Sequence, residues 1–299
     1  MAGKPTWINS RPITQGQSTD RLREVLKELS LNTVCWEANC PNIGDCWAER
    51  TATFMILGKV CTRNCHFCDV KTGKPQGQIN NAEPTLLKEA CKRLDLEYMV
   101  LTSVDRDDLE DGGATHFFKS IQAVKELDNP PTIEALIPDF QAEESHLRTI
   151  AGSSAEVIGH NIETVARLTP QVRDPKASYQ ASLKVLKKIK RFNPNLITKS
   201  SLMMGLGETK PEIISTIRDL REAGVDILTI GQYLRPSPSQ LPVEKFWDRD
   251  EFQELEKLAL EEGFKAVIAG PFVRSSYKAK NTYRDALLAS CNESTTENT

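Results

Sequence analysis

The sequence ATFMILGKVCTRNCHFC, residues 52–68, joins an apolar run to a group of three cysteines. Residues 52–57 lack polar alternation, which predicts a β-strand buried on both faces. Cys61, Cys65 and Cys68 lie on the loop directly after this strand. In barrels of parallel strands, the loops that follow the strands hold the functional residues. We therefore predict that the three thiols form a functional loop after the first strand of an α/β fold.

Similar apolar, β-branched runs recur along the chain and alternate with amphipathic segments. The predicted strands are residues 52–57, 98–104, 132–137, 156–162, 196–204, 225–230 and 266–269. The predicted helices are residues 82–95, 114–126, 141–150, 178–191, 210–223 and 250–262. Strand starts spaced roughly 25 to 40 residues apart are typical of βα units that form a parallel sheet. We predict a partial (β/α)6 TIM-like barrel in preference to a doubly wound open sheet.

The repeat leaves a segment outside the barrel at each end of the chain. We assign residues 51–270 to the barrel, residues 1–50 to an N-terminal extension and residues 271–299 to a C-terminal extension. The polar residues 292–299 at the end of the second extension are expected to be disordered.

The composition limits the possible partners. The 299 residues carry 38 basic and 41 acidic side chains, a formal net charge of −3, so we expect no overall attraction to nucleic acid. No apolar stretch approaches the roughly 18 residues of a membrane-spanning helix. Residues 1–12 lack the apolar core of a secretory signal. We expect a soluble, cytoplasmic protein with no nucleic-acid or membrane partner.

Six of the eight cysteines lie between Cys35 and Cys68. Disulfide frameworks belong to small secreted chains, whereas clustered thiols in a reducing compartment more often bind metal. The three thiolates of the loop can hold three irons of a [4Fe-4S] cluster, and no fourth cysteine follows nearby. One iron is then open to a substrate or cofactor. A zinc site is the alternative, but its fourth ligand would be His66, which lies between the thiols.

A second group of three cysteines lies upstream. Cys35, Cys40 and Cys46 are separated by four and then five residues, and they again fall one thiol short of a closed site. From the residues alone, this group is compatible with a structural zinc, a second cluster or reduced structural cysteines.

Both groups belong to a wider pattern. The spacing of the loop cysteines, with an aromatic residue before the last one, resembles the signature of the radical S-adenosylmethionine (SAM) superfamily. Both cysteine groups, together with Arg274-Ser275-Ser276-Tyr277, resemble the lipoyl synthase family within it. The likeness covers about residues 30–280 and includes residues 104–113, 160–164 and 204–208.

The resemblance implies an enzyme with two [4Fe-4S] clusters. The cluster that cleaves SAM has three thiolate ligands, Cys61, Cys65 and Cys68. The auxiliary cluster, which donates sulfur, has three thiolates and one serine: Cys35, Cys40, Cys46 and Ser276. Ser275 is the alternative serine, and the alternative role for either serine is a helix cap.

The resemblance also implies the reaction and its partners. Two sulfur atoms enter an octanoyl chain, at its sixth and eighth carbons, while the chain is amide-linked to a lysine of a lipoyl carrier domain. The carriers are E2 subunits of 2-oxoacid dehydrogenases and the glycine cleavage H protein. A low-potential reductant such as ferredoxin or flavodoxin supplies electrons, and an iron–sulfur carrier rebuilds the auxiliary cluster. No catalytic residue beyond the cluster ligands is expected.

Two other functions fit parts of the pattern. The first is a radical SAM enzyme that inserts sulfur into a free small molecule, although the Arg274–Tyr277 motif argues against it. The second is a non-catalytic iron–sulfur electron carrier, which needs closed clusters.

SAM contains a carboxylate, an ammonium group and a ribose, so its site needs a cation and polar groups. Thr102 and Ser103 lie at the end of the second predicted strand, and Asn161 lies at the end of the fourth. We expect these three side chains to meet polar groups of SAM and Arg173 to pair with its carboxylate. Ordinary loop hydrogen bonds are the alternative role for all four.

Overall fold

The computed structural model describes residue 5, residues 17–34 and residues 42–296. Its eight strands form one sheet in chain order, and all neighbours from β2 to β8 are parallel. The strands are β1 (Asn32–Thr33), β2 (Thr51–Ile56), β3 (Tyr98–Ser103), β4 (Thr132–Leu136), β5 (Val157–Gly159), β6 (Ile197–Met204), β7 (Ile227–Gln232) and β8 (Ala266–Gly270). Within the described residues β8 does not pair with β2, so the barrel is open along one side.

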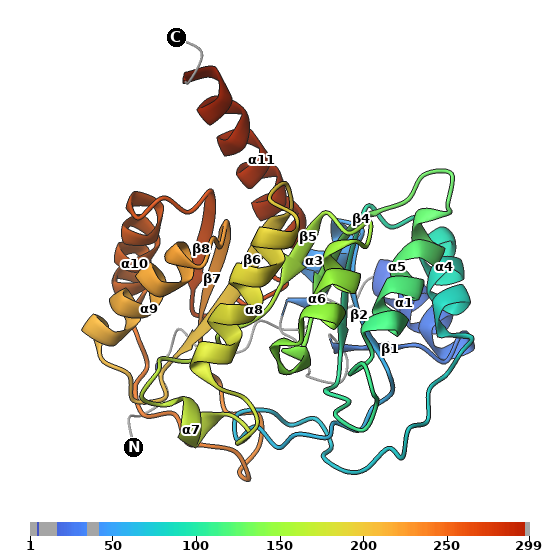
Figure 1. Cartoon of the computed structure of the whole chain (residues 1–299), viewed down its shortest axis with the longest axis horizontal. Helices are drawn as coiled ribbons and strands as arrows, with labels where there is room; N and C mark the ends of the chain where they lie inside the picture. The colour runs from blue at the N-terminus through green and yellow to red at the C-terminus, as the bar shows by residue number, and fades with distance from the viewer. Residues whose placement is uncertain (1–4, 6–16, 35–41, 297–299) are drawn as a thin grey trace.

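Six helices connect the seven parallel strands (Figure 1). They are α4 (Glu83–Leu94), α5 (Ala114–Lys125), α6 (Glu144–Ala151), α8 (Tyr179–Phe192), α9 (Lys210–Glu222) and α10 (Arg249–Glu261). All seven predicted strands and all six predicted helices are present, so the predicted α/β partial barrel is confirmed. Further helical segments within the described residues are α1 (Gln17–Glu28), α3 (Ile43–Ala48), the 3-10 helix η2 (Phe140–Ala142), α7 (Thr169–Val172) and α11 (Ala279–Thr296).

Both faces of the sheet are buried, which explains why the strands are nearly continuous apolar runs. On the outer face, Leu202 and Met204 of β6 share an apolar cluster with Ile213 and Ile217 of α9. This helix begins at a capping box in which the Glu212 carboxylate accepts the Thr209 backbone N–H at 2.8 Å.

The inner face carries a buried polar group. The Nζ atom of Lys199 on β6 bonds both carboxylate oxygens of Glu134 on β4 at 2.8 Å. The Tyr98 hydroxyl of β3 donates to the same carboxylate at 2.9 Å. Because all three side chains are almost fully buried, these bonds connect β3, β4 and β6 inside the barrel.

The first turns of α11 cover the end of the barrel at which the strands begin. Ala279 packs with Tyr98 and Val100 of β3, and the Tyr283 ring centroid lies 6.1 Å from that of Tyr98. The helix then extends away from the barrel (Figure 1). It continues to Thr296. Residues 297–299 lie outside the described residues, and the disorder expected at this end of the chain stays a prediction.

The segment before the barrel is joined to the sheet. Strand β1 pairs antiparallel with β2, with Asn32 opposite Met55. Helix α1 is held against α4 because Arg21 donates to the Arg93 carbonyl at 2.8 Å, and Arg93 pairs with Glu28. Among the described helices, none has both the length and the apolarity needed to cross a membrane.

Candidate functional site

The three loop cysteines lie where the chain leaves β2, at the end of the barrel where the strands finish. Each half-buried thiol accepts a hydrogen bond from a backbone N–H. The N···S distance is 3.4 Å for both Cys61 and Cys65. The donors are the N–H of Arg63 for Cys61, of Asp174 for Cys65 and of Val70 for Cys68. Hydrogen bonds to sulfur are a feature of iron–sulfur sites, where they tune the reduction potential.

The same thiols do not form a site for one ion. In the described part of the chain, no three His, Cys, Asp or Glu side chains are grouped closely enough to hold a metal ion. In a four-iron cluster each thiolate binds a different iron, so the sulfurs stand farther apart than the ligands of a single ion. The donor set therefore fits a cluster better than it fits zinc.

The pKa values of these thiols indicate what they need in order to ionise. Burial, followed by the nearby charge of Asp105, raises the pKa of Cys61 to about 11. Burial raises the pKa of Cys65 to about 12, and it also raises the pKa of Cys68. Without metal the thiols are neutral at pH 7, so a bound metal would have to supply the positive charge that stabilises the thiolates.

Two buried side chains fix the start of the cysteine loop at Leu57, which has a positive φ of 66°. Its N–H donates to Glu83 Oε2, and its carbonyl accepts from Arg106 Nη1, both at 2.9 Å. His116 Nε2 lies 2.8 Å from the same Glu83 oxygen, and Arg106 pairs with Asp108 at 2.8 Å. Together they set the direction in which the chain leaves β2. No local pattern in the sequence predicts this role for the four side chains.

Arg63, inside the cysteine loop, is held by three aspartates. Its guanidinium pairs with Asp139 at 2.6 Å, with Asp107 at 2.9 Å and with Asp105 at 3.4 Å. Burial alone would raise the pKa of Asp139 and of Asp107, but the bonds from Arg63 outweigh it and lower both. The network anchors the middle of the loop to the ends of β3 and β4. Its sequence signal was the run of three acidic residues within residues 105–108, immediately after β3.

The structure places Thr102 and Ser103 at the last two positions of β3. The Thr102 hydroxyl donates to the Leu136 carbonyl at 3.0 Å, so its proton is used within the sheet. The buried Ser103 Oγ atom has no hydrogen-bond partner among the described residues. Of the two, Ser103 is therefore the better placed to bond a ligand.

Arg173 directly follows α7 and is almost fully buried. Its Nη1 donates to Ser182 Oγ at 2.7 Å, while its Nε finds no partner in the described chain. Ser182 Oγ lies 2.9 Å from His160 Nε2, and His160 Nδ1 lies 2.9 Å from the Ile137 carbonyl. Burial lowers the pKa of His160 to about 4, so the ring is neutral and donates from Nδ1. This chain of bonds holds the guanidinium in place and leaves part of it for a further acceptor.

Asn161 lies two residues after β5, and its side chain hydrogen-bonds Glu163. Burial raises the pKa of Glu163, and Arg173 acts in the opposite direction. Glu163 and Arg173 both lie close enough to Cys65 to influence the pKa of its thiol. The fold therefore gathers Arg173 and the Asn161–Glu163 pair around the cysteine loop.

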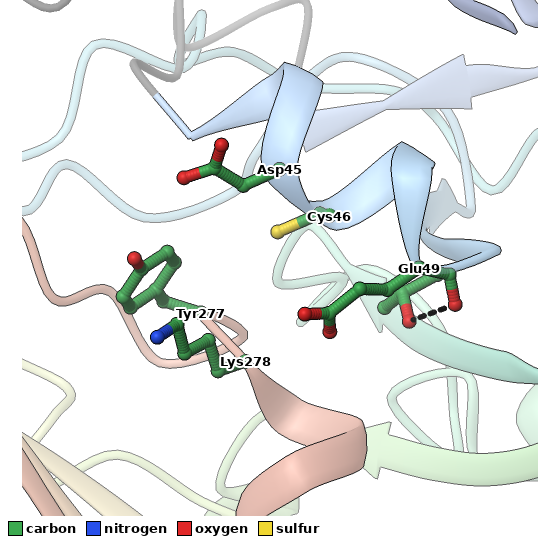
Figure 2. A pocket seen from close by; sticks show the side chains of 6 residues that line it. Asp45, Cys46, Glu49, Tyr277 and Lys278 are labelled. Carbon is green, nitrogen blue, oxygen red and sulfur yellow. Dashed lines mark hydrogen bonds between the residues drawn. The ribbon is translucent and has the colours of Figure 1, made fainter.

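Of the second cysteine group, Cys35 and Cys40 lie outside the described residues. Cys46 is half-buried on α3 and lines a small pocket. The other lining residues are Asp45, Glu49, Thr51, Tyr277 and Lys278. Figure 2 shows Cys46 and Tyr277 facing the same space from α3 and from the turn before α11. Ser275 and Ser276 are half-buried in that turn, so the two extensions meet beside the sulfur of Cys46.

Comparisons with known proteins agree with this arrangement. The family model of the radical SAM superfamily matches residues 55–220. The chain is 51% identical to a lipoyl synthase of Thermus thermophilus over 283 residues, which are 95% of this chain and 87% of the relative. It is also 51% identical to a lipoyl synthase of Halorhodospira halophila, over 92% of this chain and 82% of the relative.

Two solved structures have the same fold at low sequence identity. The FeFe-hydrogenase maturase HydG from Carboxydothermus hydrogenoformans has a TM-score of 0.58 at 12% identity, over 90% of this chain and 68% of that one. Methylornithine synthase has a TM-score of 0.50 at 17% identity, over 79% of this chain and 69% of that one. The identity, the coverage and the cysteine loop agree: the chain belongs to the lipoyl synthase family of the radical SAM superfamily.

Proposed function

We propose that this chain inserts two sulfur atoms, at the sixth and eighth carbons, into an octanoyl chain amide-linked to a lysine of a lipoyl carrier domain. The observation that carries the proposal is that Cys46 of the second cysteine group shares a pocket with Tyr277, the residue next to Ser276. The first group, Cys61, Cys65 and Cys68, lies separately on the loop after β2. A radical SAM enzyme without a sulfur donor needs only the first.

The first site serves SAM. As a member of the radical SAM superfamily, the protein uses a [4Fe-4S] cluster and SAM, and when bound these supply the radical chemistry that removes hydrogen from unactivated carbons. We assign the cluster to Cys61, Cys65 and Cys68. Arg173 offers a fixed cation for the SAM carboxylate, and Ser103 offers a free hydroxyl. Asn161 and Thr102 complete the proposed SAM contacts.

The second site would hold the auxiliary [4Fe-4S] cluster, with Cys35, Cys40, Cys46 and Ser276 as ligands. Its support is the pocket shared by Cys46 and Tyr277, the residue next to Ser276. A serine oxygen binds iron less well than a thiolate does, so Ser276 is suited to release its iron when sulfide leaves. The division of the chain at residues 50 and 270 is part of the same proposal, because both extensions contribute ligands.

The partners follow from the proposed reaction. The substrate is an octanoylated carrier, either an E2 subunit of a 2-oxoacid dehydrogenase or the glycine cleavage H protein. Ferredoxin or flavodoxin would supply electrons, and an iron–sulfur carrier would restore the auxiliary cluster after each round. The cytoplasmic location stays a prediction of the sequence.

An anaerobic assay with an octanoyl-lysine peptide tests the proposal. The reconstituted protein is expected to hold about eight irons, the sum of two four-iron clusters. With SAM and dithionite it should form 5′-deoxyadenosine and the dithiolated peptide. Cys46→Ala should still form 5′-deoxyadenosine but no thiolated product, whereas Cys61→Ala should form neither. Cys291→Ala, which changes an exposed cysteine on α11, is the matched control and should retain both. Thiolated product from Cys46→Ala would overturn the sulfur-donor role of the second site.

A further inference from the structure

The segment that precedes the two serines is held against the barrel by residues far away in the sequence. The Asn42 side chain, at the start of α3, donates from Nδ2 to the Phe272 carbonyl at 2.8 Å. Arg274 Nη1 donates to the Gln232 carbonyl, at the end of β7, at 3.0 Å. Residues 272–274 are therefore fixed from both sides of the open barrel edge.

A third contact comes from Gly231 on β7. A Cβ atom placed on Gly231 would lie only 2.2 Å from the Val273 carbonyl oxygen and 3.1 Å from its carbonyl carbon. Real side chains do not approach backbone this closely, so the segment can lie here only because residue 231 has no side chain. The φ angle of Gly231 is not in the left-handed region, so the backbone itself would accept alanine.

These three contacts lie directly upstream of the serines. Val273 is three residues before Ser276, and Tyr277 follows Ser276 and lines the pocket beside Cys46. If the Val273 backbone moves, the short turn that follows it should move as well, and with it the hydroxyl groups of Ser275 and Ser276. Asn42 adds a link between the two extensions, because it lies four residues before Cys46 and bonds the segment that carries the serines.

We propose that Gly231 and Asn42 are positioning residues for the serine side of the auxiliary site. They hold residues 272–274 so that Ser276 faces the site of Cys46. This inference rests on the proposed function, because it takes Ser276 as a cluster ligand. Neither residue touches substrate or cluster in this scheme, and both act through the backbone of the turn.

Gly231→Ala tests the inference most directly. To admit the methyl group, Val273 must move by roughly 1 Å, an error that can cost about a hundredfold when it misplaces a reacting group. We expect the variant to form 5′-deoxyadenosine, because the ligands of the SAM cluster are untouched. Sulfur inserted per 5′-deoxyadenosine should fall by at least about tenfold. The spectroscopic signal of the auxiliary cluster should change while that of the SAM cluster stays, because the three thiolates of the auxiliary cluster remain and only its serine is displaced.

A second readout needs no cluster. In cluster-free protein, hydrogen exchange of the backbone amides of residues 273–278 should be at least about tenfold faster in Gly231→Ala than in the wild type. The matched control is Gly270→Ala, four residues before Arg274. A methyl group there meets only Val273 Cγ2 at 3.4 Å, an ordinary contact, so this variant should behave as the wild type.

Asn42→Ala is the second variant, and it decides the matter if Gly231→Ala fails to fold. It removes the bond to Phe272 without adding bulk, and it should show the same pattern with a smaller change. A wild-type product ratio, auxiliary-cluster signal and hydrogen exchange in both variants would overturn the inference. A wild-type protein that holds only about four irons would instead contradict the proposed auxiliary cluster. The exchange measurement would then still decide whether Gly231 and Asn42 hold the turn.

Discussion

At the scale of single residues, the position of the cysteine loop depends on charged side chains that are not proposed ligands of the cluster or of SAM. Glu83 accepts the backbone N–H of Leu57, and Arg106 donates to the carbonyl of the same residue. Both charged side chains are almost fully buried. A buried backbone group that loses its partner costs more than a typical hydrogen bond contributes, so the pair fixes Leu57 tightly.

Glu83→Ala leaves the Leu57 N–H and the His116 ring without their acceptor. We expect a loss of about 1–3 kcal/mol of stability for each unsatisfied group, together with a lower iron content after reconstitution. Urea unfolding and iron analysis measure the two effects. Glu89→Ala, an exposed carboxylate on the same helix α4, is the control and should change neither. Unchanged values for Glu83→Ala would show that the loop does not need this acceptor.

Arg63→Lys removes the forked donor that serves Asp107 and Asp139. Lysine keeps the charge but not the paired geometry, and we expect a loss of about 1–3 kcal/mol at pH 7. In the folded protein the pKa values of both aspartates lie below the ordinary value of 3.8. Their contribution is therefore present above about pH 4 and lost as the pH falls through the folded pKa values.

The difference in melting temperature between cluster-free wild type and Arg63→Lys should accordingly be largest near neutral pH and shrink below about pH 4. Arg218→Lys alters an exposed pair with Glu262 and should show little difference at any pH. If the difference in melting temperature between wild type and Arg63→Lys stayed constant from pH 7 to pH 3, the pairing of Arg63 with the carboxylates would not be its cause.

At the scale of secondary structure, the elements predicted correctly are those with a regular apolar pattern that packs into the core. β6 and α9 share one apolar cluster, so their patterns were visible in the sequence. β1 has only two residues and forms through its pairing with β2, which no local pattern specifies. α7 is a single turn held against the cysteine loop, where the His66 N–H donates to the Val172 carbonyl at 2.9 Å. These elements come from tertiary contacts, which local periodicity does not report.

The capping box of α9 gives a prediction at this scale. Glu212→Ala removes the acceptor of the Thr209 N–H and the partner of Arg167, which donates to it at 2.6 Å. We expect a loss of about 1 kcal/mol in the free energy of unfolding, measured with urea. Glu222→Ala, at the far end of the same helix, removes an acidic group from a helix C-terminus and should be neutral or slightly stabilising. Equal effects at both ends would contradict the capping role.

At the scale of the whole molecule, the buried bonds inside the barrel join strands that are distant in sequence. Lys199→Met leaves Glu134 buried with only Tyr98 as its partner. Breaking a buried ion pair from one side typically costs about 3–5 kcal/mol, so this variant should unfold at much lower urea concentration. The double variant Glu134→Gln with Lys199→Met should recover much of the loss. A double variant no more stable than the single one would show that Glu134 is not the destabilising group.

The candidate site was likewise predictable only in part from the sequence. The spacing of the cysteines identified both cysteine groups, because spacing is local, whereas only the resemblance to the family identified the serines. Three contacts depend on how the open barrel edge is packed. Cys46 and Tyr277 line one pocket, Asn42 bonds Phe272, and the Val273 backbone lies directly against Gly231. None of these contacts leaves a local sequence signal.

The bond between Asn42 and Phe272 spans 230 residues and therefore has a consequence for synthesis. A ribosome adds about 5–20 residues each second, so roughly 12 to 46 s pass between the appearance of the two partners. During that interval Cys46 has been made, while the turn that carries Tyr277 and lines the same pocket has not. The pocket beside Cys46 can therefore be completed only late in translation.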